Sequence, residues 1–522
     1  MSFFDSFTKF RDLLHGAKFG AEVDRCFPEH ESRSATVGAA ASLSPAGPAG
    51  PAASQPVRKE WFAAELHKML DFLRRFYHDA GKAEHTFMDP SGSLVDCVPF
   101  GELATVRAIR AKGGTVVEQG PRPSGFQPQP RKRGFDRPPA SLPVIPMLHR
   151  GLVDRFGKRL ACPDGCVPVA RLTTDDMVRV GSFDQFFTKA HFTNPPPAKK
   201  GKKAAAKPAA KGARKSARAS GKAVNPAAVN PAAVNPAAVN PAAGVNAGHF
   251  YANTNDGPVG VGRGPYFGCA TGLSIREPSV PQTHASISQL WLIGDNIRRR
   301  DGNFAFQTVE SGWMVQPAFS QTNAPVLFVF FNPDGYQSGA AYVINPNDFA
   351  HGFVPAPDAP FAINQHGFLI PPAPGGTPTT IVMHWEFFDA PTPGWYLHIG
   401  QVGQSPADFF FLGHFPASLY AGTMLESRCQ FAQFGGEVGR NTTSPVGFTQ
   451  MGSGIPPNSD ALFNFSNVAF QRDIRVQTTQ NAPMAPADLV PLQVDAAAGF
   501  DLNIPTDPAF QSFIFFGGGG NV

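Results

Sequence analysis

Two glutamates carry the clearest chemical signal in this chain of 522 residues. The half from residue 248 onward holds five glutamates, and two of them have unusual neighbours. Glu310 lies in Phe306-Gln-Thr-Val-Glu-Ser-Gly-Trp313, and Glu437 follows Gly435-Gly436, a pair that allows close backbone approach or a bulge. Two carboxyl groups brought together beside apolar side chains do not ionise together, so one can act as a base and the other as an acid. Composition alone favours the simpler interpretation of two solvent-facing glutamates at strand ends.

The usual signatures of other catalytic or metal sites do not occur. The sequence has no H-E-x-x-H, no paired C-x-x-C, no Walker loop and no G-x-S-x-G. Cys162-Pro-Asp-Gly-Cys166 has three intervening residues and no second pair, so we do not expect zinc there; a local disulfide and reduced thiols both stay open. The sequence therefore predicts neither a metal nor a cofactor.

Charge divides the chain into two unlike halves. Every lysine lies at or before Lys222. Residues 1–247 carry 36 Lys and Arg against 21 Asp and Glu, a net charge of +15, whereas residues 248–522 carry 9 Arg against 19 acids, a net charge of −10. The halves should attract each other at neutral pH. Because the basic charge belongs to one half only, we do not expect nucleic acid as the main partner.

Three stretches of different character precede residue 248. Residues 1–56 combine an N-terminal helix with a flexible Ala/Pro/Gly linker, and residues 57–194 form a smaller α+β domain. Within it, residues 57–80 give the strongest helical periodicity of the chain. Residues 195–247 are a low-complexity linker of Lys, Ala and Pro that ends in four Val-Asn-Pro-Ala-Ala repeats, too short and too polar to bury a core.

Residues 248–522 have the pattern of a β domain. Strand-like runs at 325–331, 379–388 and 395–399 alternate with turn sequences such as Asn332-Pro-Asp-Gly335 and Ala390-Pro-Thr-Pro-Gly394. Short aromatic strands joined by Gly/Pro turns are typical of antiparallel sandwiches and barrels. The sequence therefore predicts a mainly β protein, with an antiparallel β-sandwich preceded by the smaller α+β domain and a disordered linker.

The order of motifs in this half resembles the neprosin family of glutamic peptidases. The motifs are Ser288-Gln-Leu-Trp-Leu292, Thr308-Val-Glu-Ser-Gly-Trp313, Asp334-Gly-Tyr-Gln-Ser338, Gly352-Phe-Val354, Phe434-Gly-Gly-Glu437 and Thr449-Gln-Met-Gly-Ser-Gly454. Residues 87–98 and 162–171 are similar to the activation peptide of that family. The resemblance spans most of residues 248–480 and also reaches the smaller domain.

The resemblance implies a fold, an activity and a set of site residues. It implies a zymogen whose β-sandwich carries Glu310 and Glu437 as the catalytic pair in a groove on one face, without a cofactor. The substrates would be proline-containing peptides or proteins, cut on the carboxyl side of proline. Residues at family motif positions that would line the groove are Trp313, Tyr336, Gln337 and, more weakly, Gln450.

Regulation follows as a hypothesis from charge and linker together. The basic half, bound in cis as a pro-domain, would cover the groove at neutral pH and leave it as the acids are neutralised. The extended linker then offers bonds that the enzyme itself could cut, after Pro226, Pro231, Pro236 and Pro241. We therefore expect activity and self-cleavage at acidic pH.

The location and the partners are less directly indicated. Charges interrupt the first twenty residues, so they do not have the pattern of a secretory signal, and no apolar run reaches the length of a membrane span. The family resemblance implies secretion or another acidic compartment, and a monomer is expected. A different class of function is a non-catalytic sandwich that binds glycan or peptide through surface aromatics such as Trp291, Trp313 and Trp395. A third class is binding of an anionic surface or nucleic acid through residues 199–222.

Overall fold

The fold is that of a computed structural model of the full chain. The structure describes residues 64–73, 82–89, 94–127, 157–172, 248–258, 263–281, 284–298, 304–317, 324–335, 341–342, 352–357, 359–360, 362–363, 379–440, 448–457, 467–505 and 512–521. The predicted N-terminal helix and the whole linker 195–247, with its four prolines, lie outside the described residues.

Two compact units make up the chain. One unit comprises residues 1–79 and 173–183, and the other comprises residues 80–172 and 184–522. In the first unit, residues 64–73 are helical and bury Leu66, Met69 and Leu73 at helical spacing, as the periodicity of residues 57–80 predicts. This division crosses the segment 57–194, so the domain boundaries drawn from the sequence stay a prediction.

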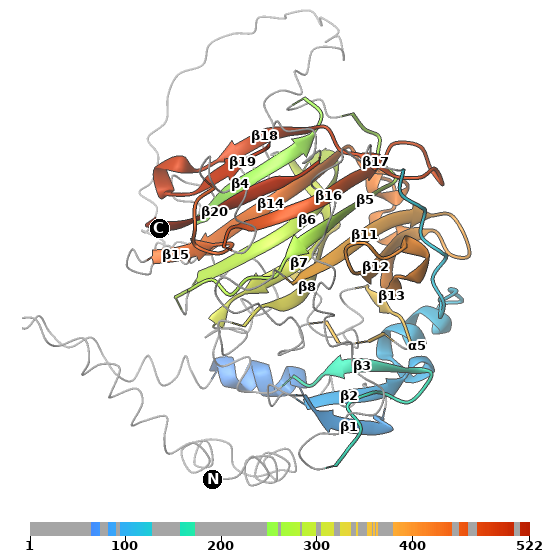
Figure 1. The fold of residues 1–522 in the computed structure, drawn as a ribbon. Helices are drawn as coiled ribbons and strands as arrows, with labels where there is room; N and C mark the ends of the chain where they lie inside the picture. Colours follow the sequence, from blue (N-terminus) through green and yellow to red (C-terminus); the bar gives the residue numbers. More distant parts are fainter. Residues whose placement is uncertain are drawn as a thin grey trace, which may run out of the picture. The chain divides into compact units, whose positions relative to one another are not determined.

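One antiparallel sheet of the second unit holds seven strands in the order β18-β4-β14-β6-β7-β8-β9 (Figure 1). Its strands are β4 (His249–Asp256), β6 (His284–Arg298), β7 (Phe304–Val315), β8 (Val326–Asn332), β9 (Ala341–Tyr342), β14 (Phe431–Arg440) and β18 (Leu489–Val494). Strand β6 pairs with β7, which follows it in sequence, and with β14, which lies more than 100 residues later. Both pairings are antiparallel. This sheet therefore brings the motifs around residues 290, 310 and 437 side by side.

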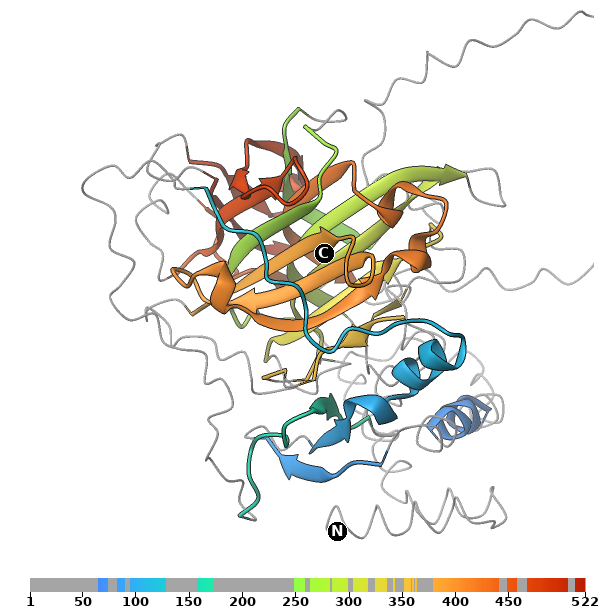
Figure 2. The same ribbon diagram turned by 90° about the vertical axis from the view of Figure 1, so that its right-hand side faces the viewer.

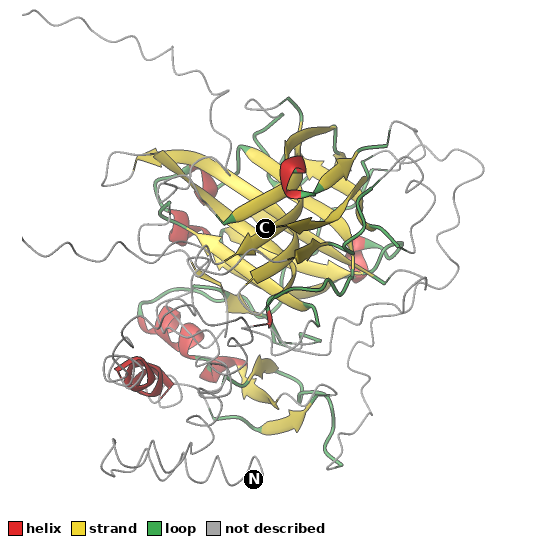
Figure 3. Cartoon of the chain, turned by 90° about the vertical axis from the view of Figure 1, so that its left-hand side faces the viewer, coloured by secondary structure: helices red, strands yellow, loops and turns green. Residues whose placement is uncertain are grey.

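A second antiparallel sheet has ten strands, eight of them in the order β10-β13-β12-β11-β5-β16-β20-β15. Its strands are β5 (Gly268–Ser274), β10 (Val354–Pro355), β11 (Thr380–Phe388), β12 (Gly394–Gly400), β13 (Phe410–Pro416), β15 (Phe448–Met451), β16 (Ala469–Gln477), β17 (Ala485–Pro486), β19 (Asp501–Asn503) and β20 (Ile514–Asn521). Among the described residues, the interruptions are one-turn 3₁₀ helices (Figure 3): η5 (Pro406–Asp408), η6 (Ala417–Tyr420), η7 (Met424–Glu426) and η9 (Ala496–Ala498).

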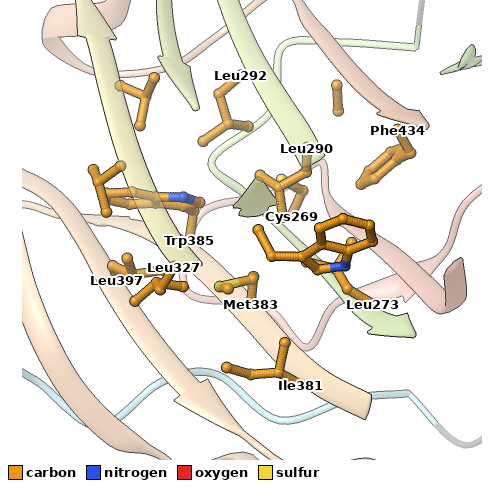
Figure 4. Packing of buried hydrophobic residues seen from close by; sticks show 14 of the residues in the cluster. Cys269, Leu273, Leu290, Leu292, Leu327, Ile381, Met383, Trp385, Leu397 and Phe434 are labelled. Carbon is orange, nitrogen blue, oxygen red and sulfur yellow. The ribbon is translucent and has the colours of Figure 1, made fainter. Parts of the chain in front are cut away.

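The core lies between these two sheets. Its fully buried side chains come from both layers, including Leu290 of β6, Phe434 of β14, and Met383 and Trp385 of β11 (Figure 4). Because side chains alternate along a strand, each sheet turns one set of residues to this core and the other set outward. The sandwich predicted from the sequence is confirmed, and the expected runs form β8, β11 and β12.

A small α+β region lies at the start of the second unit. Strands β1 (His85–Met88), β2 (Leu94–Pro99) and β3 (Cys166–Ala170) form an antiparallel sheet, followed after β2 by η1 (Phe100–Glu102) and α5 (Ala104–Ala111). This confirms a small mixed region before the sandwich.

The cysteines of this region pair differently from the local disulfide considered above. Cys162 bonds to Cys97, 65 residues away, and not to Cys166. Cys97 lies in the middle of β2, and its buried side chain packs in one cluster with Leu160 and Cys162. This packing places Cys97 beside Cys162. In the sandwich, Cys269 and Cys429 are buried free cysteines.

Membrane-spanning helices were also sought. Within the described residues, no helix combines the length and the apolar character that crossing a bilayer requires.

Candidate active site

Strand β7 directs Glu310 away from the core. Its neighbours Val309 and Trp313 pack in the core between the sheets, and the hydroxyl of Ser311 accepts a hydrogen bond from the buried indole of Trp385. Alternation therefore places Thr308, Glu310 and Gly312 on the outer face of the seven-stranded sheet.

Strand β14 presents Glu437 on the same outer face. Phe434 and Val438 point into the core, so Gly435 and Glu437 point outward. Gly435 has φ +152°, and a Cβ there would lie 2.3 Å from the carbonyl oxygen of Ala252 on β4. Only glycine allows this approach of β14 to β4, which confirms the close approach expected from the Gly-Gly pair.

The two glutamates lie at the ends of a diagonal across three strands. In the register, Glu310 stands opposite Trp291 of β6. Glu437 stands opposite Ile287, which is four residues before Trp291 in the same strand. Gln289 occupies the row between them, and its two cross-strand neighbours are Gly312 and Gly435. Two diagonal steps of about 7–8 Å each separate the Cα atoms of the glutamates by roughly 15 Å. The carboxylates thus flank Gln289, and the two neighbouring glycines carry no side chain above this row.

Hydrogen bonds hold each carboxylate at its end of the diagonal. His249 Nδ1 lies 2.7 Å from Oε1 of Glu437, and Nε2 of Gln289 donates to Oε2 of the same group at 2.5 Å. The hydroxyl of Thr308 donates to Oε1 of Glu310 at 2.8 Å. Both glutamates are 1% exposed, so the prediction from composition of two solvent-facing carboxylates is wrong. Nitrogen donors favour the ionised form of a carboxyl group, and two of them face Glu437.

An aromatic cluster shares the outer face with the carboxylates. Trp291, Ile293 and Phe306 are buried there, and the partly exposed Tyr251 and Phe431 pack against them. Tyr251 stands directly opposite Glu437 in the register, and its ring lies 6.5 Å from that of Trp291. The site therefore combines acid groups with an apolar surface that an uncharged side chain can contact.

Two other residues predicted for the groove, Trp313 and Gln450, do not join this site. Trp313 is wholly buried in the core and donates to the carbonyl of Ser274, so its predicted place in the groove is wrong. Gln450 accepts a hydrogen bond from Ser279 N at 2.7 Å, in the loop before β6. Tyr336 and Gln337 lie outside the described residues, as do Pro226, Pro231, Pro236 and Pro241.

The alternative function of glycan or peptide binding through surface tryptophans loses its basis. Trp313 and Trp395 are completely buried, and Trp291 is 6% exposed. Residues 199–222, invoked for anionic surfaces, lie outside the described residues. Across the part of the chain that the structure describes, no three His, Cys, Asp or Glu side chains are grouped so that they could hold a metal ion.

Three contact residues of the site were missed from the sequence. Gln289 was visible only as part of the Ser288–Leu292 motif, and His249 and Tyr251 belong to a strand that the motif comparison did not cover. Their spacing of two, His249-x-Tyr251, is the alternation of a strand with one outward face and could have suggested them.

The chain is similar to one protein family and to several solved structures. Residues 282–519 match the family model described as Neprosin, a range that contains both glutamates and Gln289. Similar solved structures include the scytalido-glutamic peptidase with a peptide-based transition state analog, at 10% identity and a TM-score of 0.25, covering 52% of this chain and 97% of that chain. Another is SCP-B, a member of the eqolisin family of peptidases, in a complex with the tripeptide Ala-Ile-His, at 9% identity and a TM-score of 0.24, covering 52% of this chain and 96% of that chain.

The family match includes the strands β6, β7 and β14, which carry Gln289, Glu310 and Glu437. Residues 282–519 of this chain are thus similar to the neprosin family.

Proposed function

We propose that this protein is a glutamic endopeptidase that hydrolyses peptide bonds on the carboxyl side of proline at acidic pH. The neprosin match supports a glutamic peptidase. The observation that carries the proposal is the diagonal of Glu310, Gln289 and Glu437 on one outer face of the sheet.

The donors around each carboxylate suggest how the two roles divide. Glu437, which faces the imidazole of His249 and the amide of Gln289, is the base that removes a proton from the attacking water. Glu310, in its protonated form, donates a proton to the leaving nitrogen as the peptide bond breaks. Each role contributes about 10²–10⁴-fold to the rate. The span of roughly 15 Å between the Cα atoms leaves room for a peptide carbonyl and a water above Gln289.

The aromatic cluster supports a preference for proline. The ring of proline is apolar and rigid, and the partly exposed faces of Tyr251 and Phe431 offer it a surface beside Glu437 and Trp291. A negatively charged side chain in this position would lose its hydration and lie beside the carboxylate of Glu437.

We propose further that the chain is made as a latent precursor. The 1% exposure of Glu310 and Glu437 in the full-length chain supports latency, since a substrate cannot reach buried carboxylates without a rearrangement. The opposite net charges of residues 1–247 and 248–522 support an attraction that acid weakens. Cleavage after Pro226, Pro231, Pro236 or Pro241 would then separate the linker.

Incubation of the purified full-length chain at pH 3 to 7 with a proline-containing peptide tests the proposal. We expect new ends after proline, in the peptide and in the linker, identified by mass spectrometry. Glu310→Gln and Glu437→Gln should lower the rate by at least about 100-fold. Glu426→Gln is the matched control, because Glu426 is exposed on η7 and lies outside the site. Full activity in either site variant, or cleavage only after Lys or Arg, would reject the proposal.

A further inference from the structure

Residues 118–127, called the strap below, cross the outer face of the ten-stranded sheet as an extended segment (Figure 2, cyan). Its end pairs with the backbone beside β17: Gln127 N donates to Met484 O and Met484 N donates to Gly125 O, both at 2.9 Å. Arg475 of β16 donates to the carbonyl of Gln127 at 2.8 Å. The strap thus extends the sheet by backbone contacts at one end.

A buried carboxylate on β11 is the centre of the contact. Glu386 has no exposed surface, and Ser124 of the strap donates to it twice, from the backbone N at 2.8 Å and from the hydroxyl. The remaining donors come from the sheet, with Gln477 Nε2 at 2.8 Å and His384 Nε2 at 3.0 Å. Two of the four hydrogen bonds that described residues make to this carboxylate therefore come from the strap.

Side chains of the strap fit the same face. The ring of Phe126 stacks on that of His384 at 5.7 Å and lies 4.6 Å below the guanidinium carbon of Arg475. The carbonyl of Pro121 lies 3.1 Å from Nε2 of His398. The side chains and the backbone of the strap are thus matched to the sheet over about seven residues, which is the kind of fit seen in specific peptide recognition.

The place of the strap in the chain gives this contact a consequence. The strap precedes the linker 195–247 in sequence, whereas Glu386, Arg475 and the other residues that bind it follow the linker. It lies on the outer face of the ten-stranded sheet, and the core separates it from the glutamate diagonal. Cutting the linker breaks none of these contacts.

We propose that the outer face of the ten-stranded sheet is a retention site, which keeps the region before the linker bound without a covalent link after the linker is cut. Its occupant is the strap, and its recognition elements are Glu386 for Ser124 and the His384–Arg475 slot for Phe126. The proposal rests on the proposed function only in expecting a cut in the linker.

Acid should weaken the retention. Burial would raise the pKa of Glu386, but the hydrogen bond and charge of His384 and the donors of Ser124 outweigh it, so the pKa lies below its usual value. Burial lowers the pKa of His398 to about 3. Other titratable groups on the described part of this face are His384, Arg475, the buried His414 and Tyr396, whose ring stacks on that of His414 at 4.7 Å. Without the strap these groups regain water, so protonation of Glu386 or His398 favours release as the pH falls.

The test uses the full chain with a site for a specific protease inserted in the Val-Asn-Pro-Ala-Ala repeats, in a Glu437→Gln background. Its outcome then does not depend on whether the protein is itself a peptidase. After cutting at pH 7, the two pieces should co-elute in size-exclusion chromatography and separate at pH 4. Ser124→Ala and Phe126→Ala, which change only the strap, should each speed dissociation by at least about 10-fold.

Matched variants and the opposite outcomes complete the test. Ser279→Ala and Glu426→Gln alter a serine in the loop before β6 and a glutamate on η7, both away from the strap, and should dissociate like the parent chain. Immediate separation of the parent pieces at pH 7 would overturn the proposal. Unchanged retention in Phe126→Ala would also overturn the proposal. The pieces would then be held together by another contact, the apolar cluster in which Val354, after the linker, packs with Phe100 and Val169, before it.

Discussion

Replacement of Gln289 by methionine tests the role of the amide that lies between the two glutamates and donates to Glu437. Methionine keeps the volume and the apolar stem, so packing is preserved, but it removes the amide that donates to Glu437 Oε2. The other amide atom, Oε1, is buried and has no hydrogen-bond partner among the described residues, so it can accept a hydrogen bond from a bound water.

The magnitude follows from the one charged hydrogen bond that is lost. A hydrogen bond to a charged group contributes about 1.5–3 kcal/mol, which corresponds to roughly 10–150-fold in rate if the bond orients the base in the transition state. We therefore expect kcat/KM for a proline peptide to fall by about 10–100-fold in Gln289→Met.

The control is a second glutamine with the same chemistry. Gln477 Nε2 donates to Glu386 at 2.8 Å on the opposite face and also to Ser124 Oγ and the carbonyl of Ala482, so Gln477→Met loses the bond to a carboxylate and two more at a distance from the site. Gln477→Met should lose at least as much unfolding free energy in urea as Gln289→Met, and only Gln289→Met should lose kcat/KM. A Gln289→Met enzyme with kcat/KM within twofold of the parent would refute the role assigned to this amide.

Three further predictions concern stability. Burial lowers the pKa of His414 to about 3. The unfolded chain binds this proton from about pH 6.5 downward, so the free energy of unfolding falls between pH 6.5 and 3 by up to about 1.4 kcal/mol per pH unit. His414→Phe should reduce the difference between the unfolding free energies that urea titrations give at pH 4 and at pH 7. Gly312→Ala would place a Cβ 2.0 Å from Ser288 O and should lower Tm by several degrees, whereas Gly519→Ala, whose nearest atom is at 3.6 Å, should leave Tm almost unchanged. Cys97→Ser opens the bridge to Cys162 over 65 residues and should cost about 4 kcal/mol in the folding of the small sheet, measured by limited proteolysis; equal proteolysis rates would contradict this.

Much of the sandwich follows from local pattern. The runs that became β8, β11 and β12 are rich in aromatic and aliphatic residues and lie between turn sequences, and such short-range signals survive in the fold. The misplacement of Trp313 was avoidable, because three positions separate it from Glu310. Within one strand, an odd separation puts two side chains on opposite faces.

The register could not be read from the sequence. Gln289 lies between the glutamates only because β6 separates β7 from β14. The pairing of β6 with β14 joins residues more than 100 positions apart in sequence. The same holds for Ser124 and Glu386, which are 262 residues apart and carry no local signature. The bond of Cys162 to Cys97 likewise follows from the pairing of the small sheet rather than from the Cys162–Cys166 spacing.

A double-mutant cycle on kcat is the most direct measurement of the claim that Glu310 and Glu437 act as one unit. Glu310→Gln and Glu437→Gln should each lower kcat by about 10²–10⁴-fold. Because groups that act together are strongly non-additive, the double variant should be no more than about tenfold slower than the slower single variant. A double variant whose loss equals the product of the two single losses would show that the carboxylates act independently, and would contradict the account.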